Sequence, residues 1–414
     1  MLRSMKTRAY KMKFACHHLS VCKNEAKQDA AFFDNYDLKY KKKEKVLKSG
    51  GSGTAVQLFF EKKGAQGKPY TGTALMKIVN SEKGKKADNL YHEAVVGFRV
   101  NEIAERFPCF IRTFGLYHEG KTGPKVNGKH FEQVLHTPSL DEMCATAGHQ
   151  ALMIEYVKGK SIKQYYKNEK FLPNLYPVLF QLYFALKMLG STYTHYDLHT
   201  SNVMLSHPKA GHCVRFEYTM PGQTQPLVFF SVYVAKIIDY GRNYEASVNP
   251  MMQTLGQKTE TGYVHPHCND KRCGHEGNKC GFVNFKSPKH PGLGFRRPNV
   301  SHDLRLLNYV QRALGSKWQG PKVQFNKNRF STEEIAFQGL PKSIHNVEDA
   351  GNYLATVVEA SNKAFESMPV YGIVRVDGVQ PWTFELNPKF KLETLKQQSH
   401  SSGGTRKKGK AQFS

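Results

Sequence analysis

Hydrophobic positions follow two different periods along this chain. Up to about residue 157, short apolar runs separated by turn residues predict β-strands. Residues 88–106 differ, because apolar side chains recur there at helical spacing, namely Leu90, Val95 or Val96, Val100, Ile103 and Phe107. From residue 159 helical periods dominate, and the long apolar stretch at 173–197 predicts a buried helix. The chain is therefore expected to be α+β, with a β-rich first part and a more helical second part.

The β-rich part begins with a glycine turn. Gly50, Gly51 and Gly53 lie between Val46-Leu47 and a β-rich run, and this spacing predicts a hairpin. Glycines let backbone N–H groups approach phosphates, so the turn is also a candidate phosphate-binding loop. An ordinary Gly/Ser hairpin or linker is the alternative.

Lys77 interrupts the apolar run of residues 73–79 (TALMKIV). A lysine inside a buried strand is costly unless its ammonium group meets an anion. The position therefore favours a functional lysine that binds a negatively charged partner.

Two polar segments hold the best candidates for chemistry. Residues 194–205 (THYDLHTSNVML) place Asp197 and Asn202 five positions apart in a polar turn, and residues 236–241 (KIIDYG) place Asp239 after two isoleucines. Phosphoryl transfer requires such oxygen-bearing side chains, because one group orients the attacking hydroxyl and two hold the magnesium ions that bridge the nucleotide phosphates. Asp and Asn are also common turn residues, which is the alternative for either segment alone.

Together these segments resemble the catalytic loop and the metal-binding loop of the protein-kinase superfamily. The other parts of such a kinase follow in order over about residues 46–315. The motifs HYDLH, IDYGR and NVSHDLRLL most resemble the divergent serine/threonine protein kinases encoded by large DNA viruses. The resemblance implies a bilobal protein kinase-like fold, with a small β-rich N-lobe that holds one helix and a larger helical C-lobe. It also implies ATP and Mg²⁺, with transfer of the γ-phosphate to Ser/Thr hydroxyls of proteins.

The resemblance assigns a role to each candidate residue. Asp197 accepts or orients the proton of the attacking hydroxyl, while Asn202 and Asp239 bind Mg²⁺. Lys77 contacts the α- and β-phosphates of ATP and pairs with a glutamate on the following helix. The glycine turn covers the phosphates.

Two further parts of the nucleotide site are expected from the resemblance. Glu93 is the first choice for the partner of Lys77 because it lies early in its helix; Glu102 is the reserve, and a surface salt bridge is the alternative for either. Residues 151–162 (ALMIEYVKGKSI) resemble a kinase hinge, in which Ile154 is the gatekeeper and the backbone from Glu155 to Val157 meets adenine. A buried strand that leads into a turn is the alternative for this stretch.

Residues 299–314 (NVSHDLRLLNYVQRAL) predict another helix. Asp303 resembles the aspartate that opens the large central helix of the C-lobe and braces the backbone of the catalytic loop. Ser301 is the expected N-cap of this helix. Further helices are expected at residues 332–340 and 346–367.

Several positions depart from the usual protein-kinase pattern. Tyr196 stands where an arginine is common, so we expect activity without phosphorylation of the activation loop. His199 stands where Ser/Thr kinases have a lysine, and no A-P-E motif is present. These departures keep a small-molecule phosphotransferase open as an alternative. A pseudokinase or basic nucleic-acid-binding scaffold is a third interpretation.

Composition adds a strong positive charge. The 414 residues carry a formal net charge of +26, so anionic partners are expected, such as nucleotide, nucleic acid, acidic protein or anionic lipid. The termini are basic, and one run is either a solvated face or a nuclear-targeting or nucleic-acid patch: Lys39, Lys41, Lys42, Lys43, Lys45 and Lys48.

The sequence also bears on the compartment. No apolar run reaches the 18 or more residues of a membrane span, and the basic N-terminus lacks an apolar signal region. Eight unevenly spaced cysteines do not predict a disulfide framework. An intracellular location is expected, in the host cytoplasm or nucleus, with packaging in a virion as a further option.

Residues 265–280 (HPHCNDKRCGHEGNKC) are dense in metal-binding side chains. A zinc site is one interpretation, with Cys268, Cys273, His275 and Cys280 as ligands. Free thiols in a polar loop are the alternative.

The expected organisation has four parts. These are a basic N-terminal extension at 1–45, the N-lobe at 46–157, the C-lobe at 158–395 and a disordered basic tail at 396–414. Within the C-lobe, residues 206–236 are expected to form an enlarged hairpin around Pro221-Gly222, and residues 242–300 a Cys/His-rich activation segment.

Overall fold

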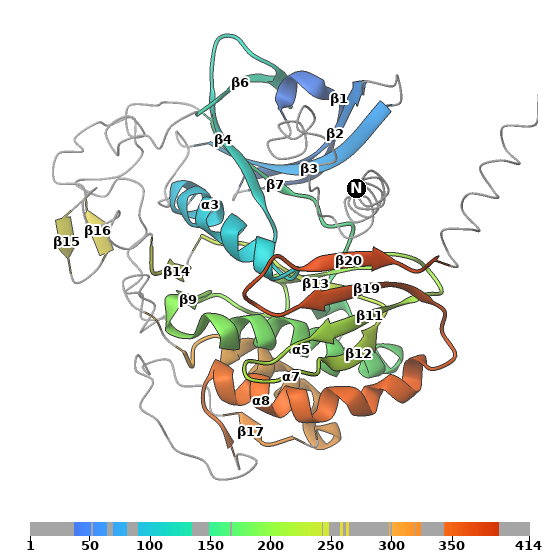
Figure 1. Ribbon diagram of the computed structural model, residues 1–414. Helices are drawn as coiled ribbons and strands as arrows, with labels where there is room; N and C mark the ends of the chain where they lie inside the picture. Colours follow the sequence, from blue (N-terminus) through green and yellow to red (C-terminus); the bar gives the residue numbers. More distant parts are fainter. Residues whose placement is uncertain are drawn as a thin grey trace, which may run out of the picture.

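The computed structural model describes residues 37–50, 53–63, 69–80, 90–134, 149–165, 168–241, 243–247, 257–259, 262–264, 298, 300–318, 320–323 and 343–388. Over these residues the fold is mixed α/β, with one large sheet and several helices (Figure 1). The large sheet and the helix α3 lie in the upper part of the figure, and α5, α7 and α8 lie in the lower part.

The large sheet has seven strands in the order β1-β2-β3-β7-β4-β6-β5, and every neighbouring pair is antiparallel. Its strands are β1 (Lys41–Gly50), β2 (Gly53–Lys63), β3 (Pro69–Asn80), β4 (Thr113–Glu119), β5 (Lys125–Val126), β6 (Lys129–Gln133) and β7 (His149–Glu155). Much of the lysine run at 39–48 is therefore strand β1 at the edge of the sheet, and the strand starts before the expected N-lobe boundary at residue 46. Exposed lysines on an edge strand also hinder pairing with other chains.

Helix α3 (Leu90–Arg106) confirms the helix expected at 88–106. Its predicted apolar positions are all buried: Leu90, Val95, Val96, Val100, Ile103 and the following Phe107. The helix approaches β4 closely, because a Cβ atom at Gly97 would lie 2.2 Å from Thr113 Oγ1. The Asn101 side chain both donates to the Thr113 carbonyl and accepts from its N–H, each at 2.8 Å. These contacts fix α3 against the sheet.

Helix α5 (Leu172–Leu189) is the centre of the second part of the chain. It is apolar on nearly all sides, as expected for a core helix, and it packs against α8 (Val347–Val358). Helix α8 continues into a 3₁₀ helix at Glu359–Phe365, which agrees with the helix expected at 346–367. The helix expected at 332–340 lies outside the described residues.

A second sheet has the order β12-β11-β19-β20. Strands β11 (Cys213–Tyr218) and β12 (Leu227–Ser231) form an antiparallel hairpin around Pro221 and Gly222. The C-terminal strands β19 (Val370–Val376) and β20 (Thr383–Leu386) complete the sheet, with β19 parallel to β11. The β11–β12 hairpin agrees with the enlarged hairpin expected at 206–236, whereas its extension by β19 and β20 into a four-stranded sheet was not expected.

The apolar run at 227–239 does not form one continuous strand, because β12 ends at Ser231. There Val232 N–H donates to Asn174 Oδ1 at 3.0 Å, and Tyr233 N–H donates to Ser231 Oγ at 3.0 Å. The chain then resumes as β13 (Val234–Ile237), which pairs with β10 (Val203–Ser206). This change of partner carries the end of β13 towards the segment that contains Asn202.

The connection between β19 and β20 contacts the end of α3. Trp382 Nε1–H donates to the Ala104 carbonyl and Trp382 N–H donates to the Glu105 carbonyl, both at 3.0 Å. Arg106 Nη1 donates to the Gly378 carbonyl at 3.4 Å. The C-terminal hairpin therefore fixes the last turn of the helix that carries Glu93.

The remaining described elements are short, apart from α7 (Leu304–Leu314). The short strands are β8 (Gly159–Ser161), β9 (Tyr193–Thr194), β14 (Tyr244–Glu245), β15 (Gln257–Thr259), β16 (Gly262–Val264), β17 (Lys322–Val323) and β18 (Ser343–Ile344). In the described part of the chain, no helix combines the length and apolar character needed to cross a membrane.

Candidate active site

The loop between β9 and β10 is held by the start of α7. The Asp303 carboxylate accepts hydrogen bonds from the backbone N–H groups of His195, at 2.8 Å, and Tyr196, at 3.0 Å. Tyr196 is fully buried and has φ 61°, a left-handed conformation that is uncommon for a bulky residue. The two hydrogen bonds stabilise this conformation, so Asp303 braces the loop backbone as expected.

The expected N-cap of α7 is wrong by two residues. Asp303 is the N-cap, and its side chain makes no capping hydrogen bond because both carboxylate oxygens bind the loop. Ser301 lies two residues before Asp303, and its carbonyl accepts a hydrogen bond from Leu304 N–H at 3.2 Å. Burial raises the pKa of the Asp303 carboxyl to about 7, while the two N–H donors favour the ionised form.

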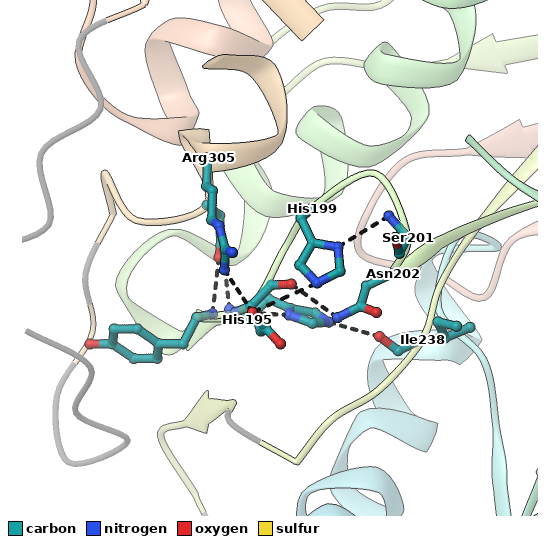
Figure 2. A network of polar contacts seen from close by, with 9 residues as sticks. His195, His199, Ser201, Asn202, Ile238 and Arg305 are labelled. Atoms are coloured by element: carbon teal, nitrogen blue, oxygen red, sulfur yellow. Dashed lines mark hydrogen bonds and ion pairs between the residues drawn. The ribbon is translucent and has the colours of Figure 1, made fainter. Parts of the chain in front are cut away.

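Asp197 and Asn202 lie together in this loop (Figure 2). Asn202 Nδ2 donates to the Asp197 carbonyl at 3.0 Å, which directs the amide group of Asn202 back into the loop. The Asp197 carboxylate lies close to two basic side chains, those of Arg305 and His199. Arg305 Nη1 donates to Asp197 Oδ1 at 2.7 Å, and His199 Nε2 lies 3.9 Å from the same oxygen.

His195 connects this loop to the segment after β13. Its Nε2 lies 3.0 Å from the Ile238 carbonyl, and its Nδ1 lies 3.3 Å from Asp197 N–H. A neutral imidazole with its proton on Nε2 satisfies both contacts, and burial lowers the pKa of His195 in agreement with a neutral ring. Ile238 N–H also donates to the Asn202 carbonyl at 3.0 Å. These bonds place Asp239, the next residue, beside the loop.

Lys77 on β3 contacts Glu93, its expected partner, and also lies near Asp239. Its Nζ lies 2.7 Å from Glu93 Oε1 and 2.6 Å from Glu93 Oε2, and 3.8 Å from Asp239 Oδ1. The Glu93 side chain is only 7% exposed, so removal of Lys77 would leave a nearly buried carboxylate without its partner. Glu102, the reserve candidate, lies instead 3.7 Å from Arg99 in an exposed pair. Lys77 thus links β3, α3 and the Asp239 segment.

The glycine turn lies close to Lys77 in the sheet, because Gly53 is two residues from the strand partner of Lys77. Gly50 pairs with Gly53 at the end of the β1–β2 hairpin, and Ala55 on β2 pairs with Lys77 on β3. Gly53 has φ 112°, and a Cβ atom there would lie 2.4 Å from the Ile78 carbonyl oxygen, so the position requires glycine. Gly51 lies outside the described residues.

Glu155 at the end of β7 has a side chain that points into the protein. Its Oε1 lies 3.0 Å from Lys236 Nζ, and both side chains are at most 2% exposed. Its Oε2 accepts from Arg112 N–H at 3.2 Å, and its own N–H donates to the Arg112 carbonyl at 2.8 Å. Burial raises the pKa of Glu155, and Lys236 acts against this shift. The N–H of Glu155 is therefore engaged, and an adenine contact would use its carbonyl and the buried Val157.

The sequence interpretation did not identify the Glu155–Lys236 pair. The signal was present, because Lys236 interrupts the apolar run VAKII in the same way that Lys77 interrupts its own strand.

The structure describes the residues of the expected magnesium site but not those of the expected zinc site. Asn202 and Asp239 offer amide and carboxylate oxygens on adjacent segments, a donor set that fits Mg²⁺. The expected zinc ligands Cys268, Cys273 and His275, and also Cys280, lie outside the described residues. Within the described ranges, no group of three or more His, Cys, Asp or Glu side chains is arranged to hold a metal ion.

Comparisons with known proteins add one similarity. No protein-family model matches the chain. Over 215 residues, the chain is 26% identical to a protein named Probable kinase 098L from Invertebrate iridescent virus 3. The match covers 49% of this chain but only 34% of that protein, so the chain spans about a third of its length. The similarity supports a distant kinase-like relationship.

Proposed function

We propose that this chain is a protein kinase of bilobal architecture that transfers the γ-phosphate of Mg-ATP to Ser/Thr hydroxyls of proteins. The observation that carries the proposal is the position of Lys77, within 2.6 Å of Glu93 and 3.8 Å of Asp239. A lysine that joins a strand, a helix and a metal-binding segment is the arrangement used to hold nucleotide phosphates. The N-lobe would extend from β1 to about residue 157, and the C-lobe would begin at about residue 158.

The proposal gives each residue of the site a chemical role. Lys77, held by Glu93, neutralises charge on the α- and β-phosphates, and the glycine turn covers them with backbone N–H groups. Asn202 and Asp239 would hold Mg²⁺, which supplies positive charge between the phosphate groups when bound.

Asp197 acts on the acceptor. It orients the hydroxyl and takes its proton as the hydroxyl oxygen bonds to the γ-phosphorus, while the bond between that phosphorus and the ADP oxygen breaks. ADP and the phosphorylated acceptor then leave. The proton returns to water from Asp197.

A small-molecule phosphotransferase is the second candidate, since His199 lies 3.9 Å from Asp197 in place of the lysine of Ser/Thr kinases. The similarity to a viral protein supports a kinase of viral type. Its proposed place of action is the host cytoplasm or nucleus, with packaging in a virion as a further option. Nucleic acid or another anionic partner would bind the basic surface, for example at β1.

A panel of acceptors tests the proposed class. The protein is incubated with γ-labelled Mg-ATP and with acidic proteins, basic proteins, or small hydroxyl and amino compounds, and labelled residues are identified after hydrolysis. Label on serine or threonine supports the protein kinase, and label only on small molecules supports the second candidate. Salt-sensitive nucleic-acid binding with no turnover of ATP would favour a scaffold instead.

The rate of transfer is expected to fall as the pH falls through about 7. Protonation of Asp303, whose pKa is raised to about 7, removes its capacity to accept both N–H bonds of the loop. The loop that carries Asp197 then loses a support, so the protonated form is the less active one. The measurement is kcat against pH, between about pH 6 and pH 8.

Asp303→Asn provides the matching variant, because an amide offers only one acceptor oxygen at every pH. We expect the variant to transfer phosphate at about one tenth of the wild-type rate or below, and its rate should show no titration near pH 7. A variant with the wild-type rate and the wild-type pH profile would show that Asp303 does not support catalysis in this way.

A further inference from the structure

The first turn of α7 contacts three consecutive residues of the catalytic loop. The His302 ring lies 5.0 Å from the ring of Tyr196, measured between centroids. The Asp303 carboxylate binds the N–H groups of His195 and Tyr196. Arg305, two residues further on, reaches the side chain of Asp197. Residues 302–305 thus hold the loop both through the loop backbone and through the carboxylate of Asp197.

The contact between Arg305 and Asp197 has the geometry of a charge-assisted hydrogen bond. Nη1 lies 2.7 Å from Oδ1, and the two side chains are 23% and 17% exposed. Exposed ion pairs contribute little because both side chains are mobile and solvated. Here the guanidinium is held from a helix and also lies 5.8 Å from the centroid of the Tyr309 ring, one turn along. Figure 2 shows Arg305 reaching the loop from above, on the side opposite Ile238.

His199 is less suited than Arg305 to hold the Asp197 carboxylate. Its Nε2 lies 3.9 Å from the same carboxylate oxygen, beyond hydrogen-bond distance, and its Nδ1 accepts the N–H of Ser201 at 3.1 Å. Arg305 is therefore the cationic group in direct hydrogen-bond contact with Asp197 among the contacts described.

We propose that Arg305 is a positioning residue for Asp197. The inference rests on the proposed phosphotransfer and adds to it a residue that lies outside the catalytic loop. By fixing Oδ1, Arg305 sets the plane of the carboxylate, so that Asp197 meets the acceptor hydroxyl in one orientation before substrate binds. The proton still passes from the hydroxyl to Asp197, and Arg305, which stays protonated, takes no part in bond making.

The test compares three variants of the full-length protein by their kcat and their KM for ATP. Arg305→Met removes the guanidinium but keeps a long side chain, Arg305→Lys keeps the charge, and Arg312→Met is a control on an exposed position of the same helix. We expect Arg305→Met to lower kcat by about 10²-fold with little change in KM for ATP, because a misplaced catalytic group costs about this much. Arg305→Lys should recover a large part of the loss, and Arg312→Met should match wild type.

Three results would overturn the proposal. An unchanged kcat in Arg305→Met would show that the contact between Arg305 and Asp197 does not affect catalysis. An increased kcat would show that this contact inhibits catalysis. An equally large loss of kcat in Arg305→Lys would also count against the proposal, provided that this variant melts at the wild-type temperature. The positive charge at residue 305 would then not be sufficient to position Asp197.

Amide hydrogen exchange separates this proposal from the proposed function. Even without transfer by the wild type, Arg305→Met should speed exchange at residues 196–199 and leave α5 unchanged. Absence of transfer in the wild type would contradict the proposed function. Unchanged exchange at the loop, together with unchanged kcat where transfer occurs, would contradict the role of Arg305.

Discussion

Replacement of Lys77 by Met is expected to lower the rate of phosphate transfer by about 10²- to 10³-fold, the usual cost of removing one charged group from a preorganised site. Lys77 is the group that joins Glu93 to Asp239, at 2.6 Å and 3.8 Å. Methionine fits the strand but cannot neutralise phosphate charge. The measurement is kcat with γ-labelled Mg-ATP, alongside the melting temperature of each variant.

A double variant separates this electrostatic effect from damage to the fold. In Lys77→Met the buried Glu93 carboxylate loses its ammonium partner, which also destabilises the protein. Lys77→Met combined with Glu93→Gln removes that charge, so the melting temperature should recover while the rate stays low. Lys45→Met, on the exposed strand β1, is the control with a wild-type rate. A full rate in Lys77→Met would exclude Lys77 from phosphate binding.

Lys236→Met is expected to destabilise the protein by about 3–5 kcal/mol, the cost of leaving a buried charge without its partner. Lys236 and Glu155 are 0% and 2% exposed and lie 3.0 Å apart. The pair joins the end of β7 to β13, three residues before Asp239, so its loss should loosen the segment that carries Asp239 as well. Urea unfolding of the variant measures the change in the free energy of unfolding.

The companion experiment removes both charges. Lys236→Met with Glu155→Gln should recover most of the lost stability, since replacing a whole buried pair is often nearly neutral. Lys236→Met as stable as the wild type would mean that the Glu155 carboxylate is already neutral or hydrated in the folded protein.

Much of the candidate site could be predicted from local sequence signals. The apolar period of residues 88–106 gave the helix and placed Glu93 near its start, and an interrupted apolar run singled out Lys77. Asp197 and Asn202 were found from their spacing in a polar turn. These features are short-range, because each depends on neighbours within one helix, strand or loop.

The features that were missed depend on contacts between distant parts of the chain. Strand β19 pairs in parallel with β11, for example Val214 with Gly372, and no local pattern specifies such a partner. Arg305 reaches Asp197 across 108 positions of sequence. Ser301 was chosen as the N-cap from its residue type, whereas the geometry of the loop placed Asp303 there. The first half of strand β1, before the expected boundary at residue 46, was hidden because lysines dominate its sequence.

Transfer of labelled γ-phosphate from Mg-ATP to protein, compared between the wild type and Asp197→Asn, tests the central claim most directly. The account predicts transfer by the wild type and a loss of about 10²- to 10⁴-fold in the variant, the range expected for removal of a general base. Mg-ATP should still bind the variant, because Lys77 and Asp239 remain. Equal transfer by both proteins would contradict the role of Asp197, and a wild-type protein that binds no nucleotide would contradict the account as a whole.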